Sequence, residues 1–254
     1  MNATRSCTPT SGSVTLLLLN VAAWLPAAWA NPGGLAVQSG TATVVAQGSQ
    51  ISVTASHNAV LHWQSFNIAP GETTRFIQPS AQSIVWNQIQ GTQPSQIWGN
   101  LHANGVVVLM NEAGFHFGPS AFVSAAGLIV STSPVVPVES GGGTFWQFQG
   151  PPPSAAIENL GQIHISNAGA AFLIANRIEN RGEISAPGGQ IGLLAARDVK
   201  LSERPDGRGL SASVELPVGA VDQSGRLLAD AGTVAIHARV VNQNRSEEHT
   251  SELQ

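Results

Sequence analysis

Short apolar and alternating segments dominate the chain from residue 31 to residue 244. They occupy residues 42–45, 51–53, 60–63, 106–110 and 128–130, and each is bounded by Gly, Asn, Pro or Ser. No long segment places apolar residues at i, i+3, i+4 and i+7 beside charged ones, which is the pattern of an amphipathic helix. The pattern therefore predicts an all-β fold of short strands joined by turns.

An internal repeat runs through the second half of the chain. Residues 157–163 (IENLGQI) recur 21 residues later as residues 178–184 (IENRGEI). A weaker echo relates residues 188–193 to residues 231–236 at an offset of 43, which we interpret as about two of the same periods. Repetition at this spacing is typical of a solenoid, and short strands with Asn-x-Gly turns favour one coil of a β-helix per repeat. A hairpin meander would also give short strands, but it needs no fixed period.

Equivalent residues of the two repeats are expected to stack on one another in successive coils. The pairs are Ile157 with Ile178, Ile163 with Ile184, Asn159 with Asn180, and Gly161 with Gly182. The isoleucines would point inward and the asparagine amides would form a ladder. The glycines would supply turn dihedrals that a β-carbon disfavours. At about 21 residues per coil the chain has room for up to about ten coils, fewer once an N-terminal cap and an insertion are subtracted.

Residues 131–156 interrupt the stack. This segment is rich in proline and glycine, and it contains the aromatic run FWQF at residues 145–148. We expect an irregular insertion here, an extra hairpin or loop that the aromatic run pins onto the stack. We also expect a cap over the first coil, because an open first coil would expose unpaired strand groups and invite edge-to-edge association.

Both ends of the chain differ from the rest. Residues 1–30 have a polar start with one arginine, an apolar middle and a small-x-small end, so we expect a signal peptide cleaved after Ala30. The single cysteine, Cys7, would be removed with it, and the mature chain would contain no disulfide. Residues 245–254 read like the translation of a DNA sequencing adapter. We interpret them as an artefact and expect the true C-terminus to be missing, with the native protein continuing beyond Asn244.

Charge is sparse and gives no sign of nucleic-acid binding. The formal net charge is −4, and between residues 31 and 157 the only charged residues are Glu72, Arg75, Glu112 and Glu139. A nucleic-acid surface would need a basic patch. Parallel β-helices also include polysaccharide lyases and hydrolases, but these need clustered carboxylates. The carboxylates of the first half are too far apart in sequence for that, and we interpret residues 197–200 and 203–206 as a solvated charged loop.

No catalytic, cofactor or metal site is expected. Apart from His249 in the segment interpreted as an artefact, the histidines are scattered without a recognised ligand spacing: His57, His62, His102, His116, His164 and His237. Trp63, Trp86 and Trp98 would suit a sugar-binding face, although packing in the core or the cap is favoured. The sequence contains no nucleophile elbow, phosphate loop or dinucleotide fingerprint.

A long ordered series of motifs resembles one known family. The motifs are WQSFNI (63–68), FIQP (76–79), VWN (85–87), PSQI (94–97), GNL (99–101), ANG (103–105), VLMN (108–111) and FGP (117–119). They resemble the two-partner secretion domain of filamentous-haemagglutinin-type exoproteins, also called the haemagglutination activity domain, over roughly residues 38–201. The resemblance implies a right-handed parallel β-helix of the pectin-lyase-like type over residues 31–244. It also implies recognition in the periplasm by the POTRA domains of a dedicated outer-membrane β-barrel transporter, passage in an unfolded state, and folding outside the cell.

The resemblance also implies a candidate site for recognition by the transporter. The family typically reads Asn-Pro-Asn-Gly-Ile shortly before Phe-Gly, and the matching residues here are Asn111, Glu112, Ala113, Gly114, Phe115, Phe117 and Gly118. Gly114 is expected to take a positive φ that keeps the turn. Changing Asn111 and Gly114 together is expected to reduce secretion while leaving the domain folded.

Two other functions stay open at this point. The chain would act as a stand-alone β-helix that binds carbohydrate or degrades polysaccharide, or the module itself would act as an adhesin. The favoured hypothesis is a non-enzymatic secretion domain of a larger adhesin, without cofactor, that reaches the bacterial surface through the periplasm. Contact with a host-cell or cell-surface receptor would then belong to a missing downstream region.

Overall fold

The computed structural model describes residues 31–140, 143–203 and 210–244. The expected signal peptide (1–30) and the expected artefact (245–254) lie outside these ranges. The described residues form β-strands joined by turns, and none of them is helical. Accordingly, no helix within these ranges has the length and apolar character needed to cross a membrane.

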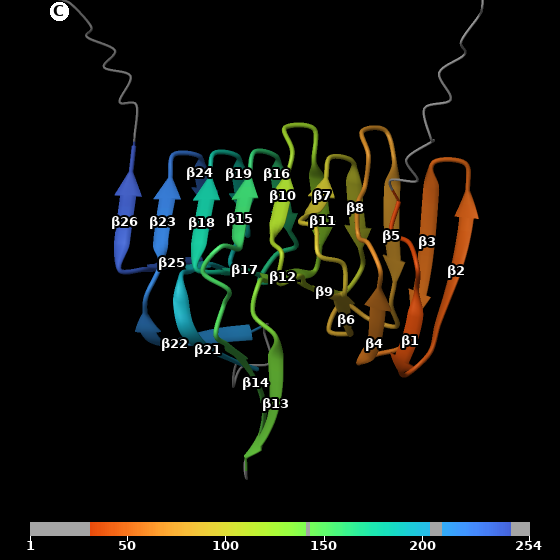
Figure 1. Ribbon diagram of the computed structural model, residues 1–254, viewed down its shortest axis with the longest axis horizontal. Coiled ribbons are helices and arrows are strands. Elements are labelled where there is room, and N and C mark those ends of the chain that lie inside the picture. Colours follow the sequence, from red (N-terminus) through yellow and green to blue (C-terminus); the bar gives the residue numbers. More distant parts are fainter. Residues whose placement is uncertain (1–30, 141–142, 204–209, 245–254) are drawn as a thin grey trace, which may run out of the picture.

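Three long sheets run along the molecule (Figure 1), and in each complete coil after the first the chain visits sheet I, sheet II and sheet III in turn. In the first coil, sheet II is represented only by the isolated bridge between Ile68 and Ile97. Sheet I contains, in spatial order, β1 (Ala36–Ser39), β4 (Ala59–Trp63), β6 (Ile84–Ile89), β9 (Val106–Met110), β12 (Gly127–Ser131), β17 (Ala170–Ile174), β20 (Gln190–Leu194) and β25 (Thr233–His237). Sheet II contains β7 (Ser95–Ile97), β10 (Phe115–Phe117), β15 (Ala156–Asn159), β18 (Arg177–Asn180), β23 (Ala220–Gln223) and β26 (Val240–Gln243). Sheet III contains β2 (Ala42–Gln47), β3 (Gln50–Ala55), β5 (Thr73–Ile77), β8 (Asn100–Ala103), β11 (Phe122–Ala125), β16 (Gln162–Ile165), β19 (Glu183–Ser185) and β24 (Arg226–Leu228).

Parallel pairing between successive coils confirms the predicted β-helix. Within these three sheets, only the first pair of sheet I, β1 with β4, and the first pair of sheet III, β2 with β3, are antiparallel. These antiparallel strands form the predicted N-terminal cap. One parallel strand of sheet I per coil, from β4 to β25, gives seven coils in the described part of the chain.

The register of the repeat is the predicted one. Ile157 pairs with Ile178, and Ile163 pairs with Ile184. Asn159 and Asn180 are fully buried, and the Nδ2 of Asn159 donates a hydrogen bond of 2.8 Å to the Oδ1 of Asn180. The ladder continues at 2.9 Å from Asn180 to the Oε1 of Gln223. Each amide is hydrogen-bonded to the next one, so the ladder avoids the free-energy cost of burying a polar group without a partner.

The glycines of the repeat serve a different purpose from the predicted one. Neither Gly161 nor Gly182 has a positive φ. Instead, a β-carbon on Gly161 would lie 2.6 Å from the carbonyl oxygen of Ala121, and one on Gly182 would clash with the carbonyl oxygen of Gly161. Glycine is therefore required because successive coils approach each other closely at this corner, and the expectation of special turn dihedrals was wrong.

Two hairpins leave the solenoid at the same corner and form a fourth sheet. The first, β13 (Val135–Ser140) and β14 (Gly143–Gln149), lies between β12 and β15. The second, β21 (Ala196–Glu203) and β22 (Leu210–Pro217), lies between β20 and β23. Antiparallel pairing of β14 with β21 joins them into sheet IV, which projects from the coils in Figure 1.

The second hairpin was not predicted, and it explains the 43-residue echo. Ile191 pairs directly with Val234 in the next coil. The offset is therefore one coil enlarged by β21 and β22, and the interpretation as two periods was wrong. An insertion about as long as a coil cannot be told from an extra coil by its spacing alone.

Sheet IV covers the outer face of sheet I and creates a second apolar core outside the coils. Sheet I contributes Trp86, Val108, Ile129 and Phe172, and sheet IV contributes Trp146, Phe148, Val199 and Leu201. The ring centroids of Trp86 and Trp146 lie 5.5 Å apart. The aromatic run at residues 145–148 thus pins its hairpin to the stack through Trp146 and Phe148, as predicted.

Candidate functional site

The predicted recognition segment begins with a tight turn between β9 and β10, at the corner between sheets I and II. The amide of Gly114 donates a hydrogen bond of 3.0 Å to the carbonyl oxygen of Asn111. The amide of Ala113 donates one of 2.9 Å to the Oδ1 of Asn111. Gly114 has a φ of +113°, so it takes the positive φ expected from the sequence.

Asn111 and Gly114 hold this corner of the fold together. Asn111 is buried, and its Nδ2 donates hydrogen bonds to the carbonyl oxygen of Gln93 (3.1 Å) and to the Oγ of Ser95 (3.0 Å). A β-carbon on Gly114 would lie 2.6 Å from the carbonyl oxygen of Ala156 in the next coil. A double change at these positions would therefore disturb packing and hydrogen bonding, contrary to the expectation that the domain would stay folded.

The rest of the segment is also largely internal. Phe115 and Phe117 are buried, with ring centroids 6.3 Å apart. Gly118 is buried beneath the indole of Trp98, and a β-carbon there would lie 2.5 Å from the Trp98 Cδ2. Of the seven candidate residues, only Glu112 is exposed and only Ala113 is half-buried. A partner of the folded domain would reach these two alone.

Glu112 and Ala113 line a hollow of about 630 Å³ at the corner between sheets I and II. Its other lining residues include Gln88, Ile89, Met110, Ser133 and Pro134. Ser133 is 1% exposed, and its hydroxyl has no hydrogen-bond partner among the described residues. The hollow therefore combines one carboxylate with an apolar floor and a buried hydroxyl.

A row of polar side chains crosses the outer face of sheet II, one from each of its six strands. We call it the polar row; its members are Gln96, His116, Glu158, Glu179, Asp222 and Asn242. Sequence reasoning missed it, although the repeat carried the signal, because Glu158 and Glu179 occupy the same position of the two repeat units. Parallel stacking necessarily aligns such residues at about 4.8 Å per coil.

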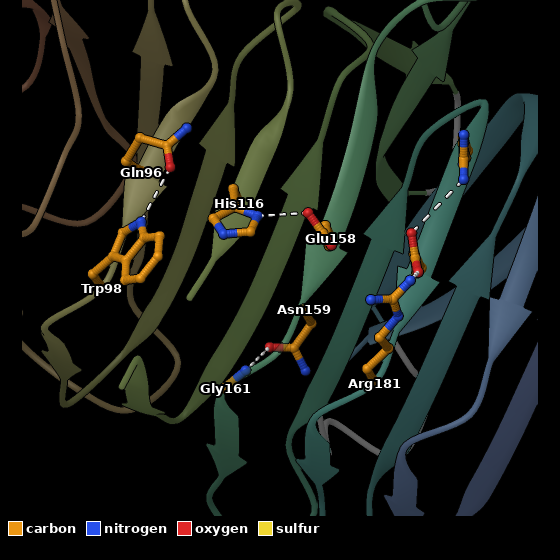
Figure 2. A network of polar contacts seen from close by, with 9 residues as sticks. Gln96, Trp98, His116, Glu158, Asn159, Gly161 and Arg181 are labelled. Atoms are coloured by element: carbon orange, nitrogen blue, oxygen red, sulfur yellow. Dashed lines mark hydrogen bonds and ion pairs between the residues drawn. The ribbon is translucent and has the colours of Figure 1, made fainter. Parts of the chain in front are cut away.

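Each carboxylate of the polar row already has a partner. The Nδ1 of His116 lies 2.6 Å from the Oε2 of Glu158 (Figure 2). Glu179 pairs with Arg181 and, at 3.8 Å, with Arg177. Asn242 donates a hydrogen bond of 2.6 Å to Asp222. Of these three carboxylates, Glu179 is paired with cationic side chains, whereas Glu158 and Asp222 are bonded to an imidazole and to a neutral amide on the same face.

The three tryptophans singled out in the sequence have different surroundings. Trp63 and Trp86 are 1% and 7% exposed, so they cannot line a binding face. Trp98 is half-buried at the corner that follows β7. Its Nε1 donates a hydrogen bond of 3.1 Å to the Oε1 of Gln96, and its ring centroid lies 5.4 Å from that of His116.

The charged segments considered for catalysis belong partly to sheet IV. Residues 197–200 lie in β21, so they form part of a strand and not the expected loop, and Lys200 forms an ion pair of 3.0 Å with Glu215. Residues 204–206 lie outside the described ranges. Within those ranges, no three His, Cys, Asp or Glu side chains are grouped so that they would hold a metal ion.

Burial, and then repulsion by Arg75, lower the pKa of His102 on sheet III.

Comparison with protein families matches residues 27–252 to the family described as TPS secretion domain. The crystal structure of the HMW1 secretion domain from Haemophilus influenzae is similar at a TM-score of 0.73 and 26% identity, over 84% of this chain and 57% of that one. The crystal structure of a filamentous hemagglutinin secretion domain matches at a TM-score of 0.45 and 14% identity, over 83% of this chain and 100% of that one.

Curated relatives are much longer than the matched region. A heme/hemopexin-binding protein of Haemophilus influenzae is 30% identical over 161 residues, which are 61% of this chain and 18% of the relative. A second heme/hemopexin-binding protein of the same species is 36% identical over 77 residues, which are 30% of this chain and 8% of the relative. The chain thus spans less than a fifth of the length of these relatives.

Proposed function

The chain belongs to the TPS secretion domain family, and from this membership we propose that it is the N-terminal secretion domain of a larger surface protein, such as an adhesin. TPS domains leave the cell through a partner transporter in the outer membrane, and the exoproteins that carry them reach the cell surface. The proposed partner is a dedicated β-barrel whose periplasmic POTRA domains recognise this chain. The domain itself would take no part in catalysis, and the activity of the whole protein would reside downstream.

The observation that best supports this proposal is the difference between the two ends of the β-helix. The N-terminal end is closed by the antiparallel strands β1, β2 and β3. The opposite end presents β24, β25 and β26, which have no further partner strand among the described residues. β1 and β2 are also the last strands of their sheets, but they run antiparallel to their neighbours, so the parallel stack begins beside them and extends from the N-terminus onward. That is the order in which an exported chain emerges, so each new coil would find a finished one to pair with.

Burial of the candidate segment determines when it would be recognised. Asn111, Gly114 and Phe117 are inside the folded domain, where a transporter cannot touch them. If these residues contact the POTRA domains, they do so before the coil closes, which agrees with passage in an unfolded state. Glu112 and Ala113 are accessible both before and after folding. They are the positions where recognition is separable from stability.

A secretion assay tests the proposal. The gene recovered from genomic DNA is expressed with and without the neighbouring outer-membrane barrel gene, and the domain is measured in the medium and in the periplasm. Appearance in the medium only with the barrel is the expected result. A folded domain that stays in the periplasm in both strains would overturn the proposed function.

Exposed variants test the candidate segment separately. Glu112→Lys combined with Ala113→Lys leaves the buried contacts intact and is expected to lower secretion. Asp230→Lys, at an exposed turn elsewhere, is the matched control and should be secreted normally. Normal secretion of the double variant would remove this loop from the recognition site.

A further inference from the structure

Trp98 is a surface tryptophan that is held in one orientation. Its indole covers Gly118, where any β-carbon would collide with the ring. Its N–H is bound by Gln96, and His116 packs beside it at 5.4 Å. Figure 2 shows this group at one end of the polar row. A half-buried aromatic ring that is fixed before any ligand arrives loses little conformational entropy on binding.

The polar row continues this aromatic group along the solenoid axis. His116 contacts both Trp98 and Glu158, so the ring and the first carboxylate belong to one continuous surface. Every member of the row is exposed or half-buried, which makes it accessible across six coils. At Glu158 the bond to His116 uses Oε2, and no hydrogen bond to Oε1 occurs among the described residues. This face thus offers an aromatic platform followed by acceptors and donors at regular spacing.

We propose that Trp98 and the polar row bind a neutral polysaccharide that runs across the coils. One sugar ring stacks on the indole, and hydroxyls of the following units bond to Glu158 and its neighbours. The coils repeat at about 4.8 Å, close to the length of one pyranose unit, so a regular glycan meets equivalent groups in successive coils. A ligand rich in hydroxyls suits a row whose carboxylates have histidine, arginine and asparagine partners and still offer acceptor atoms.

Charge selects this occupant over others. Among the described residues of this face, the two cations Arg177 and Arg181 are set against the three carboxylates of Glu158, Glu179 and Asp222. The face therefore lacks the excess positive charge that binds nucleic acid or an anionic membrane surface. The aromatic ring, in turn, provides an apolar contact that the CH groups of a sugar ring match. This site goes beyond the proposed export function and does not depend on it.

Affinity electrophoresis tests this inference with the purified full chain. Native gels contain a soluble mixed-linkage β-glucan, a galactomannan or dextran, and the mobility is compared with that in a gel without polysaccharide. We expect at least one of these polymers to retard the chain. Trp98→Ala should weaken the apparent affinity about tenfold or more, equivalent to about 1.4 kcal/mol, whereas Trp98→Phe should keep part of it.

Phe122→Ala is the matched control, because Phe122 is a half-buried aromatic residue beside His102 and His164 on sheet III. It should be retarded like the unaltered chain. If Trp98→Ala does not fold, as checked by circular dichroism, Glu158→Gln replaces it and should also reduce retardation. The inference is overturned if none of the three polymers retards the chain, or if the Trp98 or Glu158 variant is retarded as much as the Phe122 variant.

Discussion

The outer faces of sheet I and sheet II carry rows of opposite chemistry on one scaffold. In sheet I the residues that follow one another across the coils are Trp86, Val108, Ile129 and Phe172. In sheet II they are the members of the polar row. The apolar row is covered by sheet IV, whereas the polar row remains accessible. Parallel stacking aligns the outward-pointing side chains of successive coils into rows. An apolar row therefore needs a cover that shields it from water, whereas a polar row does not.

The cover is built from two hairpins that leave the same corner two coils apart. The first hairpin places Trp146 and Phe148 over this face, and the second adds Val199, Leu201 and Leu210. Their joint sheet depends on the pairing of β14 with β21. The strands that the solenoid adds outside its coils thus lie over the apolar face, and not over the polar one.

The largest expected effect comes from emptying the covered face. Phe172→Ala removes a ring that is 2% exposed beneath sheet IV, and we expect a loss of about 3–5 kcal/mol of unfolding free energy. Urea denaturation measures this loss. Phe122→Ala, on the uncovered sheet III, is the matched control and should cost much less. Equal losses would show that sheet IV does not bury this face in solution.

Next in size is the amide ladder at the corner between sheets II and III. Asn180→Ala leaves the Nδ2 of Asn159 and the Oε1 of Gln223 without their partner. Unsatisfied buried polar groups cost about 1–3 kcal/mol, which the same denaturation experiment would detect. Asn242→Ala, at an exposed amide of the polar row, should change stability far less. A neutral Asn180→Ala would contradict a ladder that stabilises the coils.

A smaller effect, dependent on pH, is expected from His102 on sheet III. Its pKa lies below 6.5 because burial, and then Arg75, penalise the charged ring. Below pH 6.5 the unfolded chain therefore binds a proton that the folded chain resists, and stability falls as the pH drops from 6.5 toward the folded pKa. His102→Gln should lose less stability over that interval than the unaltered chain. Identical pH profiles would refute this assignment.

The smallest effect is expected on the polar row itself. A double-mutant cycle of His116→Gln and Glu158→Gln should give a coupling of about 0.2–1 kcal/mol, because the pair is partly solvated. The measurement compares the unfolding free energies of the two single variants and the double variant. A coupling as large as the loss from Phe172→Ala would mean that the two faces contribute equally to stability.

The second half of the fold could be predicted in detail because its repeat is visible in the residues themselves. Identical side chains such as Asn159 and Asn180 stack directly, so their spacing gave the register. The second hairpin could not be found, because a 43-residue offset fits two coils as well as one coil with an insertion. A structural need for glycine at residue 161 was predicted, but for the wrong reason. The actual reason is the close approach of successive coils, which depends on three-dimensional packing.

The candidate site was predictable only as a segment. Its motif positions run from the corner before β10 to the corner after it, but sequence alone cannot show that Asn111, Phe115 and Phe117 are internal while Glu112 is exposed. The polar row could have been predicted from the sequence, since Glu158 and Glu179 occupy equivalent positions of the repeat. The orientation of Trp98 could not have been predicted, because Gly118 beneath it comes from the next coil.

The central claim is that this chain carries its own signal for export by a partner transporter. The most direct test fuses residues 1–244 to a reporter enzyme that is not normally exported, and expresses the fusion with and without the barrel. We predict reporter activity in the medium only when both the domain and the barrel are present. Reporter activity that stays inside the cells with the barrel present, or that reaches the medium without it, would contradict the claim.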